Sequence, residues 1–247
     1  MTEEPIQDAN PITLDDFTGL LIHSYNNHLS SMMGYAELAL LECEDEKVGE
    51  RLNKSLESGI SAVHFGKSIL ASIGRLQVNR SEVNFKVWFS SFIELLQVDF
   101  ENNELVIENL VPENIDILTD FSWFTECCTD LVRFLLAFDT NADLTFNSGI
   151  ESFDVEDLEI KDFDAKGTKE QPLIENRVVI NINSKQVELD DNQQKWLFMP
   201  FYSSRLLLGE KDIGLAKVKG FFEQIDASIY WENESGFSIE IPIAIAN

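Results

Sequence analysis

Apolar residues recur every three to four positions over the first third of the chain, the spacing that places them on one face of an α-helix. The pattern predicts one long helix over residues 13–42, begun by Thr13 or Asp15, and a second over 47–77. The short polar turn CEDEK separates the two. Two amphipathic helices joined in this way form an antiparallel hairpin, which cannot bury its apolar stripe alone. We therefore expect a homodimer in which two hairpins form a four-helix bundle.

From about residue 80 the pattern changes to short strand-like runs mixed with helical ones. It predicts helices at 85–97, 121–138, 193–197 and 214–224, and strands at 105–110, 115–118, 144–146, 177–183, 228–233 and 237–245. The acidic stretch 151–172 is expected to be a loop. We expect an α+β protein with two domains, the helical hairpin over 1–79 and a two-layer α/β sandwich over 80–247.

Two histidines of the first helix face in different directions. With about 100° per residue and Leu21 set at zero, His28 falls at about −20° and His23 at about 200°. His28 therefore lies on the apolar stripe, where we expect it to pack in the core or in the dimer interface. His23 lies in the middle of the polar face beside Asn26 and Asn27, where a lone histidine is ordinarily a solvated surface residue. The stripe consists of Leu21, Tyr25, Leu29, Met32, Ala36 and Ala39.

Composition narrows the classes of function. The net charge of −26, from 44 acidic and 18 basic residues, disfavours nucleic acid and anionic membranes, because both bind clusters of Lys and Arg. No segment approaches the ~18 consecutive apolar residues of a membrane span, and the N-terminus lacks a signal-peptide pattern. Cys43, Cys127 and Cys128 are too few for a zinc cage and are interpreted as reduced packing residues. These features predict a soluble protein of the cytoplasm.

The stretch HSYNNHLSSMMGYAELAL, residues 23–40, resembles the phosphoacceptor box of sensor histidine kinases, H-[DE]-x-N-N-x-L-x-x-[IVM]-x-G-x-A-E-L-A-L. The resemblance implies that His23 carries the phosphoryl group. Ser24 stands where the family usually has the acid that orients and deprotonates the imidazole. Asn27 stands where related bundles position water for dephosphorylating the partner. Alternatively, Asn26 and Asn27 simply cover an exposed face.

The resemblance extends over the rest of the chain. Residues 117–138 lie where the family places its N-box helix, and LFMPFYSS, residues 197–204, is similar to its F-box. Residues 214–243 resemble the last helix and closing strands of the ATP-binding domain. The chain is thus similar to a histidine kinase core without a sensor or membrane segment of its own.

The residues at the family's nucleotide-binding positions are altered. The resemblance places Asp130 and Phe134 at the two asparagines of the N-box, the second of which holds Mg²⁺ in the family. Ser184 stands for the Asp that pairs with adenine, and Gln186 and Glu188 stand for the two glycines that follow it. The phenylalanine side chain cannot coordinate Mg²⁺, and serine lacks the carboxylate that pairs with adenine. The resemblance therefore implies that this part of the site is degenerate.

The second glycine loop is altered as well. Glu210 and Asp212 replace its first two glycines, and Gly214 remains. A phosphate-binding loop needs glycine so that backbone N–H groups can approach the ligand, and carboxylates would repel a polyanion. Losses in all three elements predict that the chain binds no ATP, no metal and no other cofactor. The alternative is a shifted alignment in a divergent but active kinase.

The chain keeps the phosphoacceptor box but has lost the expected nucleotide-binding residues. This combination predicts a phosphorelay histidine phosphotransferase, similar to the dimeric histidine phosphotransferases derived from kinases. It would pass a phosphoryl group between His23 and receiver-domain aspartates of response regulators, without ATP-dependent autophosphorylation. The receiver would supply the Mg²⁺ that neutralises charge during transfer. Two alternatives stay open. One is a non-catalytic pseudo-histidine kinase that binds and modulates a response regulator or a partner kinase, and the other is an active kinase with unusual ligands.

Overall fold

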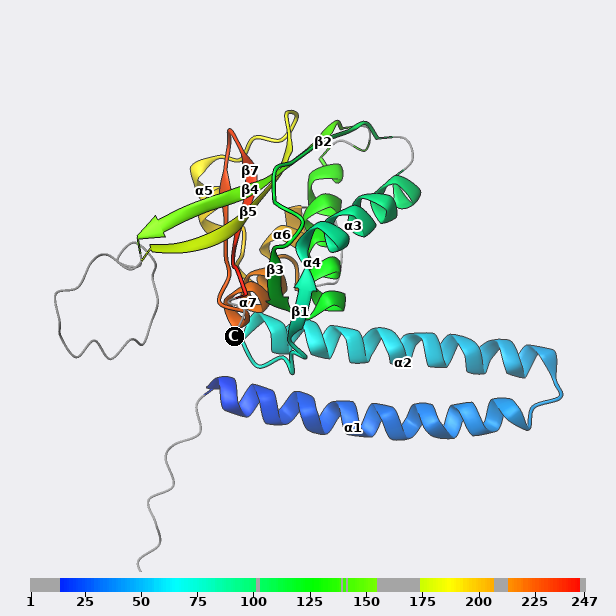
Figure 1. The fold of residues 1–247 in the computed structure, drawn as a ribbon. Coiled ribbons are helices and arrows are strands. Elements are labelled where there is room, and N and C mark those ends of the chain that lie inside the picture. The colour runs from blue at the N-terminus through cyan, green and yellow to red at the C-terminus, as the bar shows by residue number, and fades with distance from the viewer. Residues whose placement is uncertain are drawn as a thin grey trace, which may run out of the picture. The chain divides into compact units, whose positions relative to one another are not determined.

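The structure is a computed structural model that describes residues 14–100, 103–138, 140, 142–154, 174–206 and 213–244. The chain divides into two compact units, Met1–Leu76 and Gln77–Asn247. Figure 1 shows two long helices in the first unit and a sheet with several helices in the second. Within the described ranges no helix is long and apolar enough to cross a membrane.

The first unit is a helical hairpin. Helix α1 spans Leu14–Leu41 and helix α2 spans Glu46–Ser72, and the two run antiparallel as the apolar pattern predicts (Figure 1). Asp45 ends the turn between them, and its carboxylate accepts hydrogen bonds from the backbone N–H groups of Lys47 and Val48 at 2.9 and 3.1 Å. This N-cap provides acceptors for donors that the first helical turn leaves without partners, and so fixes where α2 begins.

Two glycines of α2 let α1 approach closely. A Cβ atom at Gly59 would meet Met33 Cγ at 2.7 Å, and one at Gly66 would meet Asn26 Oδ1 at 2.9 Å. The glycines are seven residues apart, about two helical turns, so both face α1. Half-buried side chains mark the matching face of α1, and these are Ile22, Asn26, Leu29, Met33, Ala36 and Leu40.

The face of α1 that packs on α2 differs from the expected stripe. Leu21, Tyr25 and Met32 belong to that stripe, yet their exposed fractions in the hairpin are 55%, 48% and 67%. The prediction that Asn26 lies on the polar face is wrong, since its amide oxygen is buried against α2 and has no hydrogen-bond partner. The apolar sector of α1 is wider than one stripe. One edge packs on α2, while the other edge, with His28, remains uncovered.

The second unit contains a five-stranded sheet with the order β2-β4-β5-β7-β6. Strands β2 and β4 are parallel, and the other neighbours are antiparallel. Strands β1 and β3 form a separate antiparallel pair. The strands are β1 Ser81–Asn84, β2 Leu105–Asn109, β3 Asp116–Thr119, β4 Leu144–Asp154, β5 Ile174–Ser184, β6 Ser228–Glu232 and β7 Gly236–Pro242.

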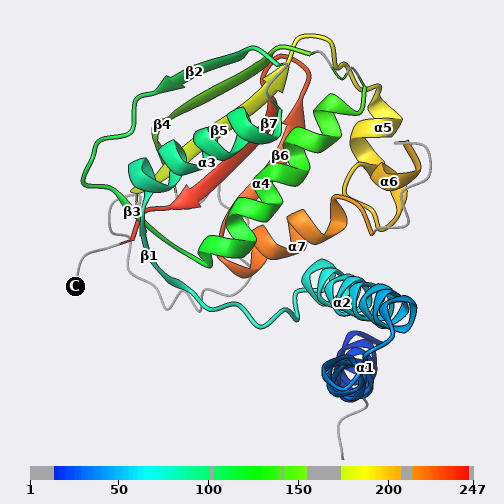
Figure 2. The same ribbon diagram turned by 90° about the vertical axis from the view of Figure 1, so that its right-hand side faces the viewer.

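Helices cover one face of this sheet, with α3, α4 and α7 in front of the strands in Figure 2. Aromatic rings join the layers: Trp88 of α3 lies 4.3 Å from Phe124 of α4, between ring centroids. Phe124 in turn contacts Phe222 of α7 at 5.8 Å, and Phe92 of α3 contacts Phe146 of β4 at 6.2 Å. The expected two-layer α/β sandwich is confirmed. Its helices are α3 Phe85–Asp99, α4 Phe121–Leu136, α5 Asp191–Trp196, α6 Tyr202–Leu206 and α7 Ala216–Gln224.

Three elements differ from the sequence prediction. Strand β4 continues to Asp154 instead of ending at residue 146, because it pairs with β5 along its whole length. The start of the expected acidic loop is therefore strand, while residues 155–172 lie outside the described residues. Strand β1 and helix α6 are only four and five residues long. Such short elements show no clear periodicity and are absent from the prediction.

Candidate functional site

His23 lies on α1 with an exposed side chain, and Ser24 beside it is exposed as well. The ring nitrogen Nδ1 of His23 is 3.3 Å from the amide nitrogen Nδ2 of Asn27, one helical turn further along. Nitrogen Nε2 has no hydrogen-bond partner among the residues that the structure describes. The ring is therefore contacted at Nδ1, while Nε2 is open to an incoming group.

The sequence around His23 carries no charge apart from its histidines. Asp16 and Glu37 are the nearest acidic residues on either side, and no Lys or Arg lies in the 20 positions between them. The chain as a whole has a net charge of −26, so this segment is a local exception. A face of α1 without carboxylates would not repel an acidic or phosphorylated partner.

Phe134 of α4, which the sequence resemblance places at the metal-binding asparagine of histidine kinases, is a core residue, only 1% exposed. Its ring centroid lies 5.2 Å from that of Phe138 and 5.6 Å from that of Phe237. Phe237 also contacts Trp231 at 4.9 Å and Phe198 of the F-box segment at 6.4 Å. Aromatic rings thus surround this position, and the Phe134 side chain has no oxygen, nitrogen or sulfur atom that could coordinate Mg²⁺.

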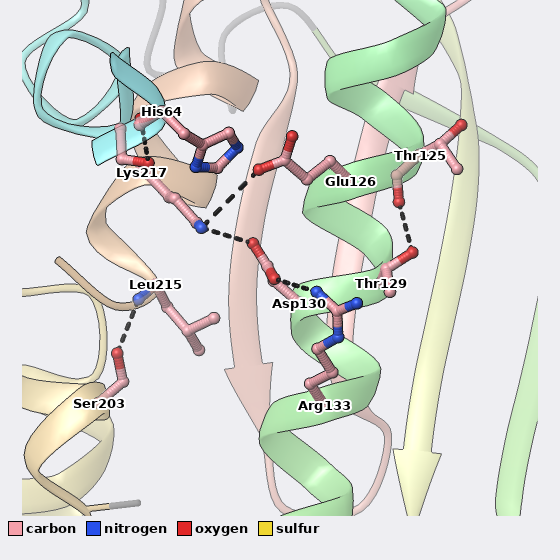
Figure 3. A network of polar contacts seen from close by, with 10 residues as sticks. His64, Thr125, Glu126, Thr129, Asp130, Arg133, Ser203, Leu215 and Lys217 are labelled. Atoms are coloured by element: carbon pink, nitrogen blue, oxygen red, sulfur yellow. Dashed lines mark hydrogen bonds and ion pairs between the residues drawn. The ribbon is translucent and has the colours of Figure 1, made fainter. Parts of the chain in front are cut away.

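Asp130, one helical turn before Phe134, is paired with a buried lysine. Lys217 of α7 is 5% exposed, and its Nζ lies 2.9 Å from Asp130 Oδ2 and 3.9 Å from a carboxylate oxygen of Glu126 (Figure 3). The contact to Asp130 Oδ2 is an ion pair without hydrogen-bond geometry. Arg133 reaches the other oxygen of Asp130 at 3.4 Å. Two cationic side chains therefore already neutralise this carboxylate.

Ser184, which the sequence resemblance places at the adenine-binding aspartate, ends strand β5 and is 1% exposed. Its hydroxyl donates a hydrogen bond of 2.8 Å to the side-chain oxygen of Gln186. Gln186 and Glu188 are exposed, whereas Val187 between them is buried. The Ser184 hydroxyl is thus satisfied within its own turn.

Gly214 precedes α7 and has a positive φ of 74°. A Cβ there would collide with Oγ of Ser203, which comes from the F-box segment. The same Oγ accepts a hydrogen bond of 2.7 Å from the backbone N–H of Leu215, the residue that caps α7 (Figure 3). A helix N-terminus is a natural anion site, because its N–H groups lack partners. Here a neutral hydroxyl of the protein accepts one of these hydrogen bonds.

The structure assembles the candidate site residues only in part. Asp130 and Phe134 lie one turn apart on α4, but Glu210 and Asp212 lie outside the described residues. Ser203 and Lys217 were not among the residues predicted from the sequence. The sequence signals that could have identified them are the SS pair ending the F-box segment and the lysine directly after GLA.

The adjacent cysteines of α4 are buried and free. Burial raises the pKa of both thiols well above the ordinary range, and the neighbouring carboxylate of Asp130 adds to the rise. Cys127 and Cys128 therefore remain protonated near neutral pH and act as packing residues rather than as nucleophiles or metal ligands.

The described residues at these positions do not fit a nucleotide and its metal. The sequence resemblance places an Mg²⁺-binding amide at Phe134 and an adenine-binding carboxylate at Ser184, and neither of these buried side chains carries the required group. No group of three or more His, Cys, Asp or Glu side chains in the described ranges is placed to share a metal ion. The arrangement can support packing and ion pairing in the α/β unit, and an exposed imidazole in the hairpin.

The fold is that of a histidine kinase core. ShkA, solved at full length in complex with AMPPNP, has a TM-score of 0.62 and 15% identity, over 95% of this chain and 47% of ShkA. The histidine kinase AdeS of Acinetobacter baumannii has a TM-score of 0.50 and 14% identity, over 89% of this chain and 96% of that chain. The chain thus spans about half the length of ShkA. The sequence matches no family model and no curated protein. At such identities the likeness shows the fold alone.

Proposed function

We propose that this chain is a phosphorelay histidine phosphotransferase of two-component signalling. His23 would accept a phosphoryl group from a receiver-domain aspartate of a response regulator and pass it to another, without autophosphorylation by ATP. The observation that carries the proposal is a contrast within one chain. The histidine of the phosphoacceptor box is exposed, whereas Phe134 and Ser184, which the resemblance places at the metal-binding and adenine-binding positions, are buried in the α/β unit.

Phosphoryl transfer from a receiver requires only one functional group of this chain, the His23 imidazole. Phosphoryl transfer to an imidazole needs in-line geometry, a nitrogen lone pair and a metal that neutralises the charge. A receiver domain brings the aspartyl phosphate and its own Mg²⁺, so the hairpin has only to present His23. The absence of charged residues on α1 between Asp16 and Glu37 supports docking of such an acidic, phosphorylated pocket.

The uncovered apolar edge of α1 supports a homodimer as the working form. Leu21, Tyr25 and Met32 lie on this edge, and their exposure in a single hairpin would be costly in water. A second hairpin placed on this edge would complete a four-helix bundle, the arrangement in which such amphipathic pairs are stable. In this bundle His28 would be buried, while His23 would stay on the outer face.

The proposal is tested by transfer from a phosphorylated receiver. Candidate receivers carrying labelled phosphate are incubated with the wild-type protein and with His23→Ala, and the label is followed. Wild type should take up acid-labile, base-stable label, and His23→Ala should take up none. The substitution removes an exposed side chain from a helix that alanine favours, so the fold and the dimer should persist. His28→Ala is the matched control and should still accept label.

Two outcomes would refute the proposal. Label that persists in His23→Ala would place the acceptor elsewhere. A receiver that binds wild type tightly but never transfers its phosphate would favour the scaffold of a non-catalytic pseudo-histidine kinase.

A further inference from the structure

We infer that the free edge of strand β2 binds an extended, basic segment of a partner protein, which would pair with β2 as an additional strand of the sheet. β2 spans Leu105–Asn109 and is the outermost of the five strands, hydrogen-bonded to β4 on one side only (Figure 2). The inference concerns the α/β unit and does not depend on the phosphotransfer proposed for His23.

The backbone of β2 alternates between bonded and open residues. At one end of the strand, the N–H of Leu144 in β4 donates to the carbonyl of Glu104 at 3.0 Å. At the other end, the N–H of Leu110 donates to the carbonyl of Ser148 in β4 at 2.8 Å. Because the backbone groups of successive strand residues point to opposite sides, the even-numbered residues bond to β4 and the odd-numbered ones point outward. The outward residues, whose backbone groups have no partner in the described part of the chain, are Leu105, Ile107 and Asn109.

The edge at β2 exposes apolar side chains on both faces of the sheet. Val106 and Leu110 are 50% and 70% exposed on one face, and Ile107 is 41% exposed on the face that the helices cover. Natural edge strands usually carry a lysine, a proline or a bulge that prevents further pairing, and the sequence LVIEN of β2 has neither residue. In β6, the strand at the opposite edge, Ile229 and Trp231 are buried. The two edges therefore differ, and only β2 presents an apolar surface beside open backbone groups.

The charge along this edge selects the partner. Exposed carboxylates of Glu104, Glu108 and Asp143 flank the pairing of β2 with β4, and none of them forms an ion pair with a described residue. Arg133 is the only Lys or Arg among residues 87–160. A second copy of the chain would bring the same carboxylates and its own net charge of −26, so it would be repelled. A segment with alternating apolar residues between Lys or Arg gains backbone hydrogen bonds, apolar contacts and charge attraction together.

The test uses the full chain and two synthetic, dye-labelled peptides. In the first, valine and threonine alternate between lysines at both ends, and in the second, glutamates replace the lysines. Fluorescence anisotropy measures the binding of each peptide. Wild type should bind the lysine peptide at least about tenfold more tightly than the glutamate peptide, and the difference should shrink as salt is added. Equal affinities for the two peptides, or no binding of either, would overturn the inference.

A charge reversal with a matched control locates the binding. Glu108→Lys should weaken binding of the lysine peptide about three- to tenfold and strengthen binding of the glutamate peptide, because one attraction becomes a repulsion. Glu232→Lys makes the same change in β6, at the opposite edge of the sheet, and should leave both affinities as in wild type. The circular dichroism of both variants should match that of wild type. Equal effects of the two substitutions would mean that the peptide does not bind at β2.

Hydrogen exchange of single amides, followed by NMR, separates strand pairing from attraction to an acidic surface. The bound lysine peptide should slow exchange at Leu105, Ile107 and Asn109 at least about tenfold, because their N–H groups gain partners. Val106 and Glu108 already donate to β4 and should slow far less. Binding without this alternation would overturn the inference. Protection of the outward amides that rises with protein concentration in the absence of peptide would also overturn it, because a second copy would then occupy the edge.

Discussion

The sequence resemblance places His23 of the helical hairpin and Phe134 of the α/β unit at two functional positions of histidine kinases, and the two side chains differ in exposure. The side chain of His23 is exposed on helix α1. The α/β unit buries Phe134 in a cluster of aromatic rings. An exposed, uncharged face is available to a partner, as the proposed function requires, whereas the buried Phe134 ring contributes to stability.

In the proposed function, the nucleotide site of the α/β unit has become part of the packed scaffold. Natural proteins commonly trade stability for an open, polar site, and a chain released from that demand can fill the site. Phe134 packs, Lys217 pairs with Asp130, and Ser203 accepts the backbone N–H of Leu215. The hairpin shows no such filling around His23, and this difference is the physical basis for proposing a relay protein instead of a kinase.

The largest expected effect comes from returning Phe134 to the family's residue. Phe134→Asn would remove a buried ring and place an amide among aromatic side chains, at a cost of about 3–5 kcal/mol in the free energy of unfolding. It should not restore Mg-ATP binding, since Lys217 and Ser203 keep their contacts. Urea unfolding and calorimetric titration measure the two effects. Phe121→Asn, at a 48% exposed position of the same helix, should cost less than about 1 kcal/mol.

Recovery of nucleotide binding in Phe134→Asn, with stability unchanged, would show that the site is open and that the filling described for the α/β unit is wrong.

A smaller loss is expected for the internal ion pair. Lys217→Met would leave Asp130 and Glu126 without their shared ammonium group, and Arg133 would compensate only in part, so we expect a loss of about 1–3 kcal/mol. Lys219→Met is the matched control on the same helix, because Lys219 pairs with Glu223 at 3.8 Å on the surface. That substitution should cost less than about 0.5 kcal/mol. Equal effects in urea unfolding would mean that Lys217 is an ordinary surface lysine.

A negative charge introduced on α1 should weaken the proposed dimer at His28 but not at His23. His28→Glu would place a carboxylate on the uncovered apolar edge of α1 and should weaken the dimer at least about tenfold, because the charge would be buried without a partner. His23→Glu, on the outer face, should leave the dimer unchanged. Sedimentation over a range of protein concentrations measures both. A wild-type monomer at micromolar concentration would refute the dimer itself.

The sequence predicted most of the fold because the signals were local. The two long helices, the α/β sandwich and the different faces of His23 and His28 all follow from periodicity. The features that the sequence did not predict depend on contacts between residues far apart in the chain. Lys217 and Asp130 meet only when α7 packs beside α4, and no local pattern reveals which acceptor a lysine will find. The sequence prediction put Asn26 on the exposed face of α1. In the structure Gly66 of α2 has no side chain, which leaves room for Asn26 to pack against α2.

The most direct test of the account compares two phosphoryl donors on one preparation of protein. The wild-type chain is incubated with Mg²⁺ and labelled ATP in one sample, and with a labelled phosphorylated receiver in the other, with His23→Ala in parallel. A relay protein should carry label from the receiver only, and His23→Ala should carry none from either donor. Label that arrives from ATP in wild type and disappears in His23→Ala would contradict the relay role, because the chain would then be a working histidine kinase.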